Sequence, residues 1–328
     1  MSKTRFLITG GAGFIGSNLS AALVATGERV RVLDNLSTGR RTLLEGLVPR
    51  GGEVELIEED IRNQEELARA MRGIEVVFHQ AAEISVPQSI AQPLTTDSIN
   101  THGTVSVLEC ARHTGVRRVI FASSAAVYGG DLELPKEESM RPRPLSPYAV
   151  SKLAGEMYLR VFSTLYGLET LSLRYFNVFG PGQLPEGPYA AAIPRLTFAA
   201  LCGRPVTIYG DGEQTRDFCY VGNVVQANLA AASSPRKHQG EVLNIAGGQA
   251  ISLNRVLQAL GALLGHPIEV RHENPRPGDI RHSWACIHRA QAYLGYQPLI
   301  SWEQGLLPTL TFLREFAAGW KHSEEQPP

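Results

Sequence analysis

The sequence predicts an α/β protein with a doubly wound parallel (Rossmann) sheet and a smaller C-terminal α/β lobe. Three observations predict this fold. The first half alternates short runs of β-branched residues with longer segments of helical periodicity, which is typical of βαβ units. A glycine-rich turn follows the first of these runs, as in dinucleotide-binding sheets. After Tyr175 the alternation stops, and proline and glycine become frequent.

The strands of the first half are expected to be runs rich in Val, Ile and Leu, because strands of a parallel sheet are buried on both faces. They are Arg5–Thr9, Val30–Leu33, Val54–Ile57, Val76–His79, Val119–Ala122 and Thr170–Arg174. Segments with apolar residues at helical spacing lie between them. They are Ile15–Thr26, Gln64–Met71, Ile99–His113 and Pro147–Tyr166.

The second half is expected to be a lobe that covers the carboxyl edge of this sheet. Proline and glycine cluster in Gly180–Pro188, Gly203–Gly212 and Pro275–Gly278, which predicts loops. Helical segments are expected at Ala190–Leu201, Asn223–Ala232, Leu253–Leu264 and Trp302–Phe316. We expect residues 1–175 to form the dinucleotide-binding domain, rejoined by about 222–245, and residues 176–328 to form mainly the substrate lobe.

Composition narrows the class of protein. The 328 residues are 43% hydrophobic and 19% charged, with a net charge of −1, which is ordinary for a globular protein. No basic excess suggests a nucleic-acid or anionic-membrane partner. No apolar run approaches the roughly 18 residues of a spanning helix, and a first strand that begins by Thr4 leaves no room for a cleavable signal.

The cysteines and histidines predict neither disulfides nor a metal site. Cys110, Cys202, Cys219 and Cys286 are scattered without CxxC spacing, which favours a reduced, cytoplasmic setting. The nine histidines form no HExxH motif and no cluster with cysteine. We therefore expect no metal in catalysis.

Gly10, Gly13 and Gly16 form a glycine turn between the first expected strand and helix. Glycine lets the backbone approach a diphosphate, and the amides of the helix N-terminus favour its negative charge. A GxxGxxG pattern alone is weak evidence, but the strand before it and the helix after it are the required context. The turn therefore predicts a dinucleotide site.

Asp34 ends the second expected strand, 18 residues after Gly16 (34 − 16). A carboxylate at this place accepts hydrogen bonds from ribose hydroxyls and repels a 2′-phosphate, so NAD is favoured over NADP. Arg40 and Arg41 leave NADP open. Asp60 follows the third strand, where it would hold the adenine amino group or serve as an ordinary turn residue.

Tyr148 and Lys152 are four residues apart, and Ser124 lies 24 residues upstream of the tyrosine (148 − 124). A phenol with a reference pKa of about 10 is a poor base at neutral pH. An ammonium one helical turn away favours the phenolate, and a serine hydroxyl can hold a substrate oxygen between them. The alternative is an exposed i,i+4 pair. Pro147 is expected in the first turn of the helix, and Ser124 closes an inner strand, so the pattern predicts hydride transfer at a carbinol carbon.

With these motifs, the chain resembles the extended short-chain dehydrogenase/reductase family. The resemblance rests on Gly10–Gly16, Ser124, Tyr148-x-x-x-Lys152 and Arg174-Tyr-Phe-Asn177-Val-Phe-Gly. Asp211-Gly-Glu-Gln-Thr-Arg216-Asp-Phe-Cys-Tyr-Val and Arg276-Pro-Gly-Asp279 are similar to nucleotide-sugar enzymes, closest to UDP-hexose 4-epimerases. The Arg-Asp-Phe-Cys-Tyr stretch is similar to bacterial 4-epimerases that act on N-acetylated UDP-hexosamines. The resemblance runs from about Thr4 to Phe316.

The resemblance implies an NAD-dependent 4-epimerase. Tyr148 would take the proton of the sugar 4-hydroxyl as hydride leaves C4, and the 4-keto sugar would rotate and take the hydride back on its other face. Lys152 would lower the pKa of Tyr148 and bind the nicotinamide ribose, while Ser124 orients the sugar oxygen. Because the cycle is redox-neutral, NAD would be a resident catalyst. The diphosphate would be bound by Asn177, Arg216 and Arg276, since arginine pairs bidentately with phosphate. The uridine ribose would be bound by Asp279.

The resemblance also implies two sets of contact residues. Those at the cofactor are Gly10, Gly13, Phe14, Ile15, Gly16, Asp34, Asn35, Ser37, Thr38, Gly39, Asp60, Ile61, Gln80, Ala81, Ala82, Tyr148, Lys152 and Tyr175. Those at the UDP-sugar are Ser85, Ser124, Tyr148, Asn177, Ala192, Ile193, Tyr209, Arg216, Arg276, Asp279 and Ser283.

Ser283 lies where the family places a residue beside the C2 substituent of the sugar. Tyrosine there would exclude an N-acetyl group, whereas serine leaves room for it unless a neighbour such as His282 fills the space. The resemblance thus implies that UDP-GlcNAc and UDP-GalNAc are substrates beside UDP-glucose and UDP-galactose. After Ser124 the chain continues Ala-Ala-Val-Tyr, without the carboxylate that related dehydratases and decarboxylases carry.

A homodimer is implied, since related enzymes pair Ile99–His113 and Pro147–Tyr166 into a four-helix bundle. Leu153, Met157 and Val161 recur at helical spacing, but could equally face the chain's own sheet. Two other functions remain open. One is a UDP-uronate 4-epimerase or another sugar-nucleotide oxidoreductase, and the other is a non-catalytic NAD-sensing protein.

Overall fold

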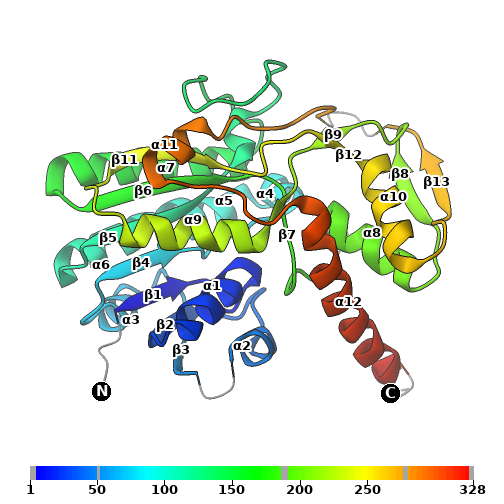
Figure 1. The fold of residues 1–328 in the computed structure, drawn as a ribbon. Coiled ribbons are helices and arrows are strands. Elements are labelled where there is room, and N and C mark those ends of the chain that lie inside the picture. The colour runs from blue at the N-terminus through cyan, green and yellow to red at the C-terminus, as the bar shows by residue number, and fades with distance from the viewer. Residues whose placement is uncertain (1–4, 50–51, 186–190, 276–279, 325–328) are drawn as a thin grey trace.

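The computed structural model describes residues 5–49, 52–185, 191–275 and 280–324 and contains a seven-stranded parallel sheet (Figure 1). The strand order is β11-β6-β5-β4-β1-β2-β3. The strands are β1 (Phe6–Thr9), β2 (Val30–Asp34), β3 (Val54–Glu58), β4 (Val76–His79), β5 (Arg118–Ser124), β6 (Glu169–Tyr175) and β11 (Gln239–Ile245). The predicted fold class is confirmed, and six of these strands lie at the predicted places. The seventh, β11, pairs with β6 and comes from the segment that was expected to return to the sheet.

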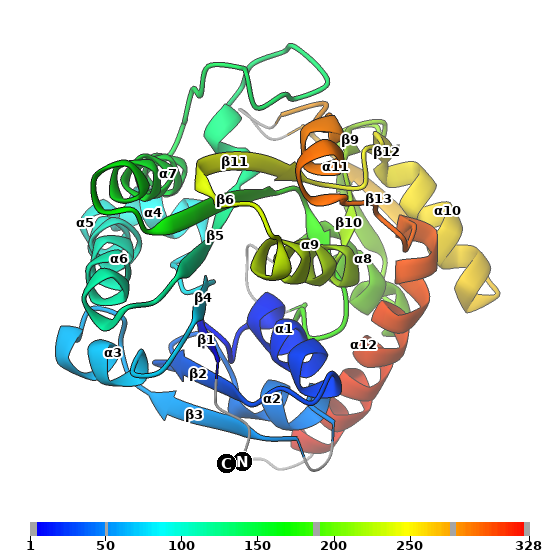
Figure 2. The ribbon, with the colours of Figure 1, turned by 60° about the vertical axis from the view of Figure 1, so that its left-hand side comes forward.

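Helices cover both faces of the sheet (Figure 2). One face carries α1 (Phe14–Ala25) and α9 (Val221–Ser233), and the other carries α3 (Gln64–Ala70), α6 (Gly103–Thr114) and α7 (Pro147–Tyr166). Two short helices, α4 (Val86–Ala91) and α5 (Pro93–Asp97), pack against α7. The remaining helix of this half, α2 (Arg41–Leu47), packs against α1.

The core has two apolar layers because successive strand residues point to opposite faces. Along β1, Phe6 and Ile8 belong to the cluster that contains Leu19 of α1. Leu7, between them, belongs to the cluster that contains Leu159 of α7. All three β1 residues are buried, which explains why the strand reads as a continuous apolar run.

A smaller group of elements lies beside the sheet around a third apolar cluster, to which Ile208, Leu260 and Leu306 belong. Its helices are α8 (Ala192–Leu201), α10 (Leu253–Leu264) and α12 (Trp302–Glu324). Its strand pairs are the parallel β8 (Val206–Tyr209) with β13 (Val270–Glu273), the antiparallel β9 (Thr215–Arg216) with β12 (Ile251–Ser252), and the parallel β7 (Val178–Phe179) with β10 (Cys219–Tyr220). A further helix, α11 (His288–Leu294), packs against β11 and α9. The domain boundaries themselves stay a prediction.

Two expectations are corrected. The helix expected at Ile99–His113 begins earlier, since α5 starts at Pro93 and continues through a π-helical stretch, Ser98–His102, into α6. Proline is favoured at the first helical position, so Pro93 was the missed signal. The expected loop Gly203–Gly212 contains β8, which is too short to show a period of its own.

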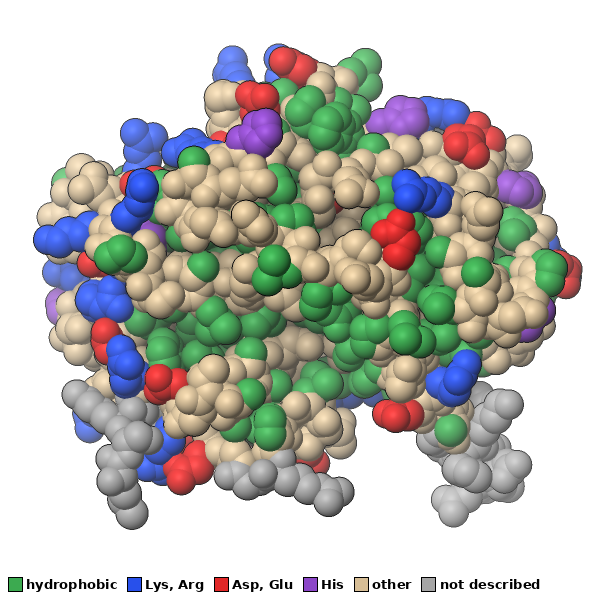
Figure 3. All heavy atoms as spheres, viewed as in Figure 1, with side chains coloured by type: hydrophobic (Ala, Val, Ile, Leu, Met, Phe, Trp, Pro, Cys, Tyr) green, Lys and Arg blue, Asp and Glu red, His purple; other side chains and the backbone are tan. Residues whose placement is uncertain are grey.

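Among the described residues, no helix is long and apolar enough to cross a membrane. Figure 3 shows the face of Figure 1 with basic and acidic side chains interspersed, and no patch of one sign. This agrees with the near-zero net charge.

Candidate active site

The carboxyl ends of the inner strands bring the predicted motifs to one edge of the sheet. β1 ends at Thr9, directly before Gly10, and β4 ends at His79, directly before Gln80. β5 ends at Ser124, which is paired in register with Tyr175 of β6. Ligands of open α/β sheets collect at such an edge.

The glycine turn can be built only with glycine at two positions. Gly10 has φ +69°, and a Cβ there would lie 2.6 Å from the Ala81 nitrogen. A Cβ on Gly16 would lie 2.3 Å from the Gly10 carbonyl oxygen. Helix α1 follows directly, and its N-cap, Gly13, has no side chain to occupy the first amides. These residues therefore fit a diphosphate group.

Asp34 is held rigidly at the end of β2. Its carboxylate accepts hydrogen bonds from the amide of Ala12 in the glycine turn and from that of Leu36, both at 2.9 Å. Burial raises the pKa of Asp34, and these two amides oppose the shift. A Cβ on Gly39 would lie 2.8 Å from the Asp34 Oδ1 atom, so glycine keeps space open beside the carboxylate. Arg41 pairs with Glu58 at 3.3 Å.

Asp60 is also a defined carboxylate, but other side chains contact both of its oxygens. Arg62 donates to Oδ1 and Oδ2 at 2.8 Å, and Asn35 donates to Oδ2 at 3.0 Å. The Arg62 guanidinium lowers the pKa of Asp60 to about 2. Asn35 thus connects the end of β2 with the end of β3, both of which were expected near the adenosine. Of the other expected cofactor residues, Ser37 and Thr38 are exposed and Ile61 is buried under Gly103.

Ser124 and Tyr148 are brought together across the edge. Ser124 Oγ accepts the Ala126 amide at 3.1 Å. Burial raises the pKa of the Tyr148 phenol, and the nearby Ser124 hydroxyl opposes part of this increase. Tyr148 lies in the first turn of α7, whose N-cap Ser146 accepts the Ala149 amide. The serine–tyrosine part of the predicted site is therefore assembled in the chain itself.

Lys152 is placed differently from the expectation that it lowers the pKa of Tyr148. Its Nζ atom donates to the Ala122 carbonyl at 2.8 Å and lies 5.0 Å from the centre of the Phe121 ring. Burial lowers the pKa of Lys152 to about 7, because a positive charge is disfavoured where water is excluded. Burial raises the pKa of Tyr148 in this structure. The Lys152 Nζ atom lies 5.9 Å from the centre of the Tyr148 ring.

Asn228 is a polar residue of this edge that the sequence did not single out. It is fully buried on α9, donates to the Tyr175 hydroxyl at 2.8 Å, and accepts from Gln80 at 3.4 Å. Gln80 also donates to the Tyr175 hydroxyl at 3.1 Å. The available signal was a polar side chain in an otherwise apolar helical stripe. Asn228 thus holds two of the expected cofactor residues.

His79 is a second buried group at this edge that was not expected there. Its ring lies between the Thr9 hydroxyl, at 2.7 Å from Nδ1, and the Thr104 hydroxyl, at 3.0 Å from Nε2. Because Thr104 donates its proton to the Asn100 carbonyl, Nε2 is the protonated nitrogen that donates to Thr104. The neutral ring therefore connects the strand before the glycine turn with helix α6.

The residues expected at the UDP-sugar come from several elements around this edge. Asn177 is exposed after β6, and Arg216 ends β9. Ser283 is partly buried, and its amide donates to the Thr215 carbonyl at 3.1 Å. The remaining members of the set lie at element ends: Ser85 caps α4, Ala192 and Ile193 begin α8, and Tyr209 ends β8. Arg276 and Asp279 lie outside the described residues.

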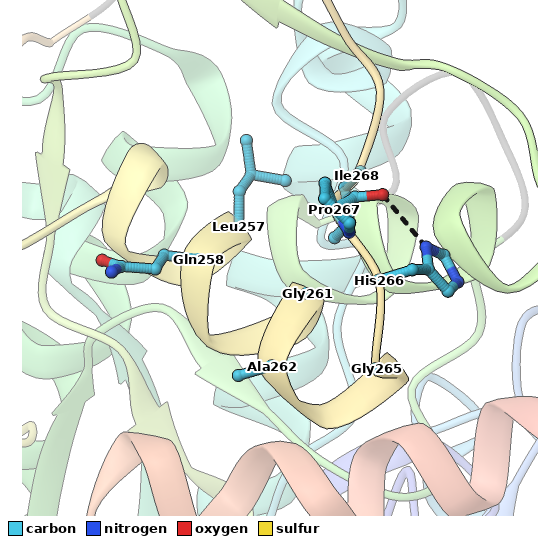
Figure 4. A pocket seen from close by; sticks show the side chains of 8 residues that line it. All are labelled: Leu257, Gln258, Gly261, Ala262, Gly265, His266, Pro267 and Ile268. Atoms are coloured by element: carbon cyan, nitrogen blue, oxygen red, sulfur yellow. Dashed lines mark hydrogen bonds between the residues drawn. The ribbon is translucent and has the colours of Figure 1, made fainter.

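A surface groove elsewhere offers no chemistry. It lies at the C-terminal end of α10 and is lined mainly by apolar residues such as Leu257, Ala262 and Ile268 (Figure 4). Its one histidine, His266, bonds to the Pro267 carbonyl at 3.0 Å. The groove belongs to the smaller group of elements and not to the carboxyl edge of the sheet.

Comparison with known proteins agrees with this geometry. The model of the NAD dependent epimerase/dehydratase family matches residues 6–246. UDP-glucose 4-epimerase of Mycolicibacterium smegmatis is 37% identical over 317 residues, which cover 94% of this chain and 98% of that protein. UDP-N-acetylglucosamine 4-epimerase from Methanobrevibacter ruminantium, solved in complex with UDP-N-acetylmuramic acid, has a TM-score of 0.89 and 37% identity, over 97% of this chain and 100% of that one. UDP-glucuronic acid 4-epimerase from Bacillus cereus, solved with UDP-glucuronic acid and NAD, has a TM-score of 0.86 and 32% identity, over 95% and 99%.

A parallel sheet with a glycine turn and a serine–tyrosine pair at its carboxyl edge defines a dinucleotide-dependent enzyme. The chain belongs to the NAD dependent epimerase/dehydratase family. It is an NAD-dependent enzyme, and its similarity to UDP-sugar 4-epimerases places it among the isomerases.

Proposed function

We propose that this enzyme interconverts UDP-glucose with UDP-galactose, and UDP-GlcNAc with UDP-GalNAc, through a 4-keto sugar. The observation that carries the proposal is that the Ser124 hydroxyl lies close enough to the Tyr148 phenol to lower its pKa, at the same edge of the sheet as the glycine turn. Bound NAD would supply the acceptor for the C4 hydride. The same site on a non-catalytic NAD sensor would not need both Tyr148 and Lys152.

Tyr148 is the proposed base for the 4-hydroxyl proton. The Ser124 hydroxyl accepts the Ala126 amide, so its own proton is free to stabilise the phenolate or the sugar oxygen. Burial works against the phenolate, because a charge is disfavoured where water is excluded. Lys152, which approaches from the next turn of α7, is proposed to bind the nicotinamide ribose and, when protonated, to favour the phenolate.

Retention of the keto sugar is expected from the residues proposed to hold the diphosphate. Asn177 and Arg216 are proposed to hold the diphosphate, so the hexose alone would rotate between oxidation and reduction. Ser124 is followed by Ala125 and Ala126, neither of which can act as an acid or base on carbons other than C4. These residues support simple oxidation and return.

Acceptance of acetamido sugars is proposed from Ser283. His282 does not move into the space beside it, since His282 Nδ1 lies 3.0 Å from the Thr215 hydroxyl and the ring is exposed. This arrangement supports the interpretation that serine leaves room at C2. UDP-uronate epimerisation is the alternative, and the similarity to the Bacillus cereus enzyme supports it.

The decisive experiment is incubation of the purified protein, without added NAD, with a panel of UDP-hexoses, UDP-N-acetylhexosamines and UDP-uronic acids, followed by chromatography. We expect epimers of the first two classes, and NAD in the supernatant after denaturation. Tyr148→Phe should lose most turnover and keep its NAD. Ser283→Tyr should lose the acetamido substrates only. Conversion of uronic acids alone would establish the alternative, and no conversion of any class would refute the proposal.

A further inference from the structure

Asp217 is a fully buried carboxylate for which the proposed chemistry has no use. It lies between β9 and β10, and its exposed fraction is 0%. None of the ion pairs found among the described residues includes it. A buried carboxylate without a cation is costly, so its hydrogen-bond partners must account for its presence.

Those partners are backbone amides from two other segments of the chain. The Gly247 amide donates to Asp217 Oδ1 at 2.7 Å, and the amides of Gly248 and Ala285 donate to Oδ2 at 3.1 Å each. Successive backbone amides that converge on one anion form a concave anion site. Here these amides hold the Asp217 carboxyl group, and they oppose the burial that raises its pKa to about 7.

The segment after β11 is shaped for this contact. Gly248 has φ +74°, which favours glycine. A Cβ on Gly247 would lie 3.2 Å from Asp217 Oδ1 and 3.1 Å from the Phe218 carbonyl oxygen. Any larger residue at Gly247 would therefore press on the carboxylate.

Proposed substrate residues lie in the segment that contains Asp217 and in the segment that contains its partner Ala285. Arg216 precedes Asp217 in the chain, and Ser283 lies two residues before Ala285. The backbone links the same segments, since Thr215 accepts the Ser283 amide at 3.1 Å and donates to the Arg281 carbonyl at 2.9 Å. The Asp217 side chain holds the same segment at Ala285, so Ser283 lies between a backbone contact at Arg281 and a side-chain contact at Ala285.

We propose that Asp217 is a positioning residue that fixes Ser283 relative to Arg216, and so sets the distance between the diphosphate site and the C2 side of the sugar site. It touches neither the substrate nor the cofactor, and it acts through the amide of Ala285. The inference rests on the proposed function, because it assigns a role to a residue that supports the UDP-sugar site.

The test is Asp217→Asn, which keeps the shape but replaces one acceptor oxygen by a donor group. An NH2 group cannot accept the amides of Gly248 and Ala285, so the segment that carries Ser283 should shift. We expect KM for UDP-glucose to rise by about 10- to 100-fold, the size of change that corresponds to losing one or two hydrogen bonds that hold the sugar site in place. We expect kcat to fall less than about threefold and NAD content to stay unchanged, because the Ser124–Tyr148 pair is not moved. The ratio of KM for UDP-GlcNAc to KM for UDP-glucose should also change.

Two further variants keep the result decisive. Asp131→Asn makes the same change in a partly exposed carboxylate that accepts the Glu133 amide and pairs with Arg143 at the surface, and it should leave both KM values unaltered. Gly247→Ala presses on the carboxylate from the opposite segment and should raise KM in the same direction, which decides the case if Asp217→Asn does not fold. A KM within twofold of the starting protein in the folded variants would overturn the inference.

A failure of the proposed function would be seen separately. Calorimetric titration with UDP alone measures the diphosphate site without turnover. If the starting protein binds UDP but converts no UDP-sugar, the proposed function fails, and a weaker Kd for UDP in Asp217→Asn would still support the positioning role. Equal Kd values in the two proteins would then overturn it.

Discussion

The Nζ atom of Lys152 lies 2.8 Å from the carbonyl oxygen of Ala122, two residues before the end of β5. This hydrogen bond ties the second turn of α7 to the strand that ends at Ser124. Tyr148, one turn earlier in α7, therefore cannot slide along the strand without breaking it. A hydrogen bond that neither residue makes thus helps to fix the Ser124 hydroxyl relative to the Tyr148 phenol.

Ser124→Ala should slow turnover by about 10- to 100-fold, the effect of one hydrogen bond to a group that becomes charged. It should also move the alkaline rise of kcat/KM to higher pH, because the Ser124 hydroxyl lowers the pKa of Tyr148. Ser124→Thr keeps the hydroxyl and is the control. An unchanged pH profile in Ser124→Ala would mean that Ser124 does not act on the phenol.

Much of the fold could be predicted because parallel strands buried on both faces leave a simple pattern. Val76–His79 and the helix Pro147–Tyr166 were predicted with their observed bounds. The short helix Arg41–Leu47 was missed because it spans about two turns and shows too few apolar positions to reveal a period. The two-residue strands of the smaller lobe are defined by their partners and leave no local signal.

The site was predictable where the chemistry depends on residue type and not where it depends on tertiary contacts. Ser124 and Tyr148 were predicted from their spacing, and the structure brings them together. The position of Lys152 on the Ala122 carbonyl could not be predicted, because it depends on how deeply α7 packs on β5. Asn228 stands out as a polar residue in an apolar helical stripe, but its role was missed because its partners Gln80 and Tyr175 are distant in the sequence.

Replacing Arg118 by Met should destabilise the protein by about 3–5 kcal/mol, as expected when one partner of a buried charged network is removed. The guanidinium is buried, donates to four carbonyl oxygens at and after the C-terminal end of α9, and pairs with Glu169. Met would remove the donor that these four carbonyls share and the closer of the two guanidinium groups that contact Glu169. Arg117→Met is the matched control, since Arg117 is exposed and its pairs with Glu75 and Glu169 are surface pairs, worth about 1 kcal/mol or less. Urea unfolding measures both, and equal losses would contradict the argument.

His79 should make the protein sensitive to acid. Burial and the nearby charge of Lys152 lower the pKa of His79 to about 3, from an ordinary value of about 6.5. The unfolded chain therefore binds a proton that the folded chain does not, at pH values between about 6.5 and 3. The stability that the neutral ring contributes is complete above pH 6.5 and is lost as the pH falls toward 3.

The His79→Gln variant tests this linkage. As the pH is lowered from about 6.5 to 3, the unfolding free energy of His79→Gln should fall less steeply than that of the starting protein. The two slopes should differ by at most about 1.4 kcal/mol per pH unit. His113→Gln, which changes an exposed histidine on α6, is the control. Parallel pH curves for His79→Gln and the starting protein would show that the His79 ring is not the group concerned.

An exposed apolar stripe on α7 supports the prediction of a homodimer. Met157 is 54% exposed, Val161 is 45% exposed and Leu165 is 66% exposed, one turn apart from one another. Leu153 is different, since it packs against the chain's own core. The neighbouring helix α5 adds Leu94, which is 86% exposed. An apolar surface of this extent on adjacent helices is typical of a protein interface.

Reversing the polarity of this stripe should prevent association of two copies. In a two-fold symmetric dimer both copies contribute the same surface patch to the interface. The double change Met157→Glu and Val161→Glu would therefore place the negative charges of both copies in one interface. We expect dimers for the starting protein and monomers for this variant by light scattering at micromolar concentration. Leu299→Glu is the control, because Leu299 is equally apolar and 69% exposed but lies outside the stripe. It should remain a dimer. A starting protein that is monomeric, or a double variant that still pairs, would show that the stripe is not the interface.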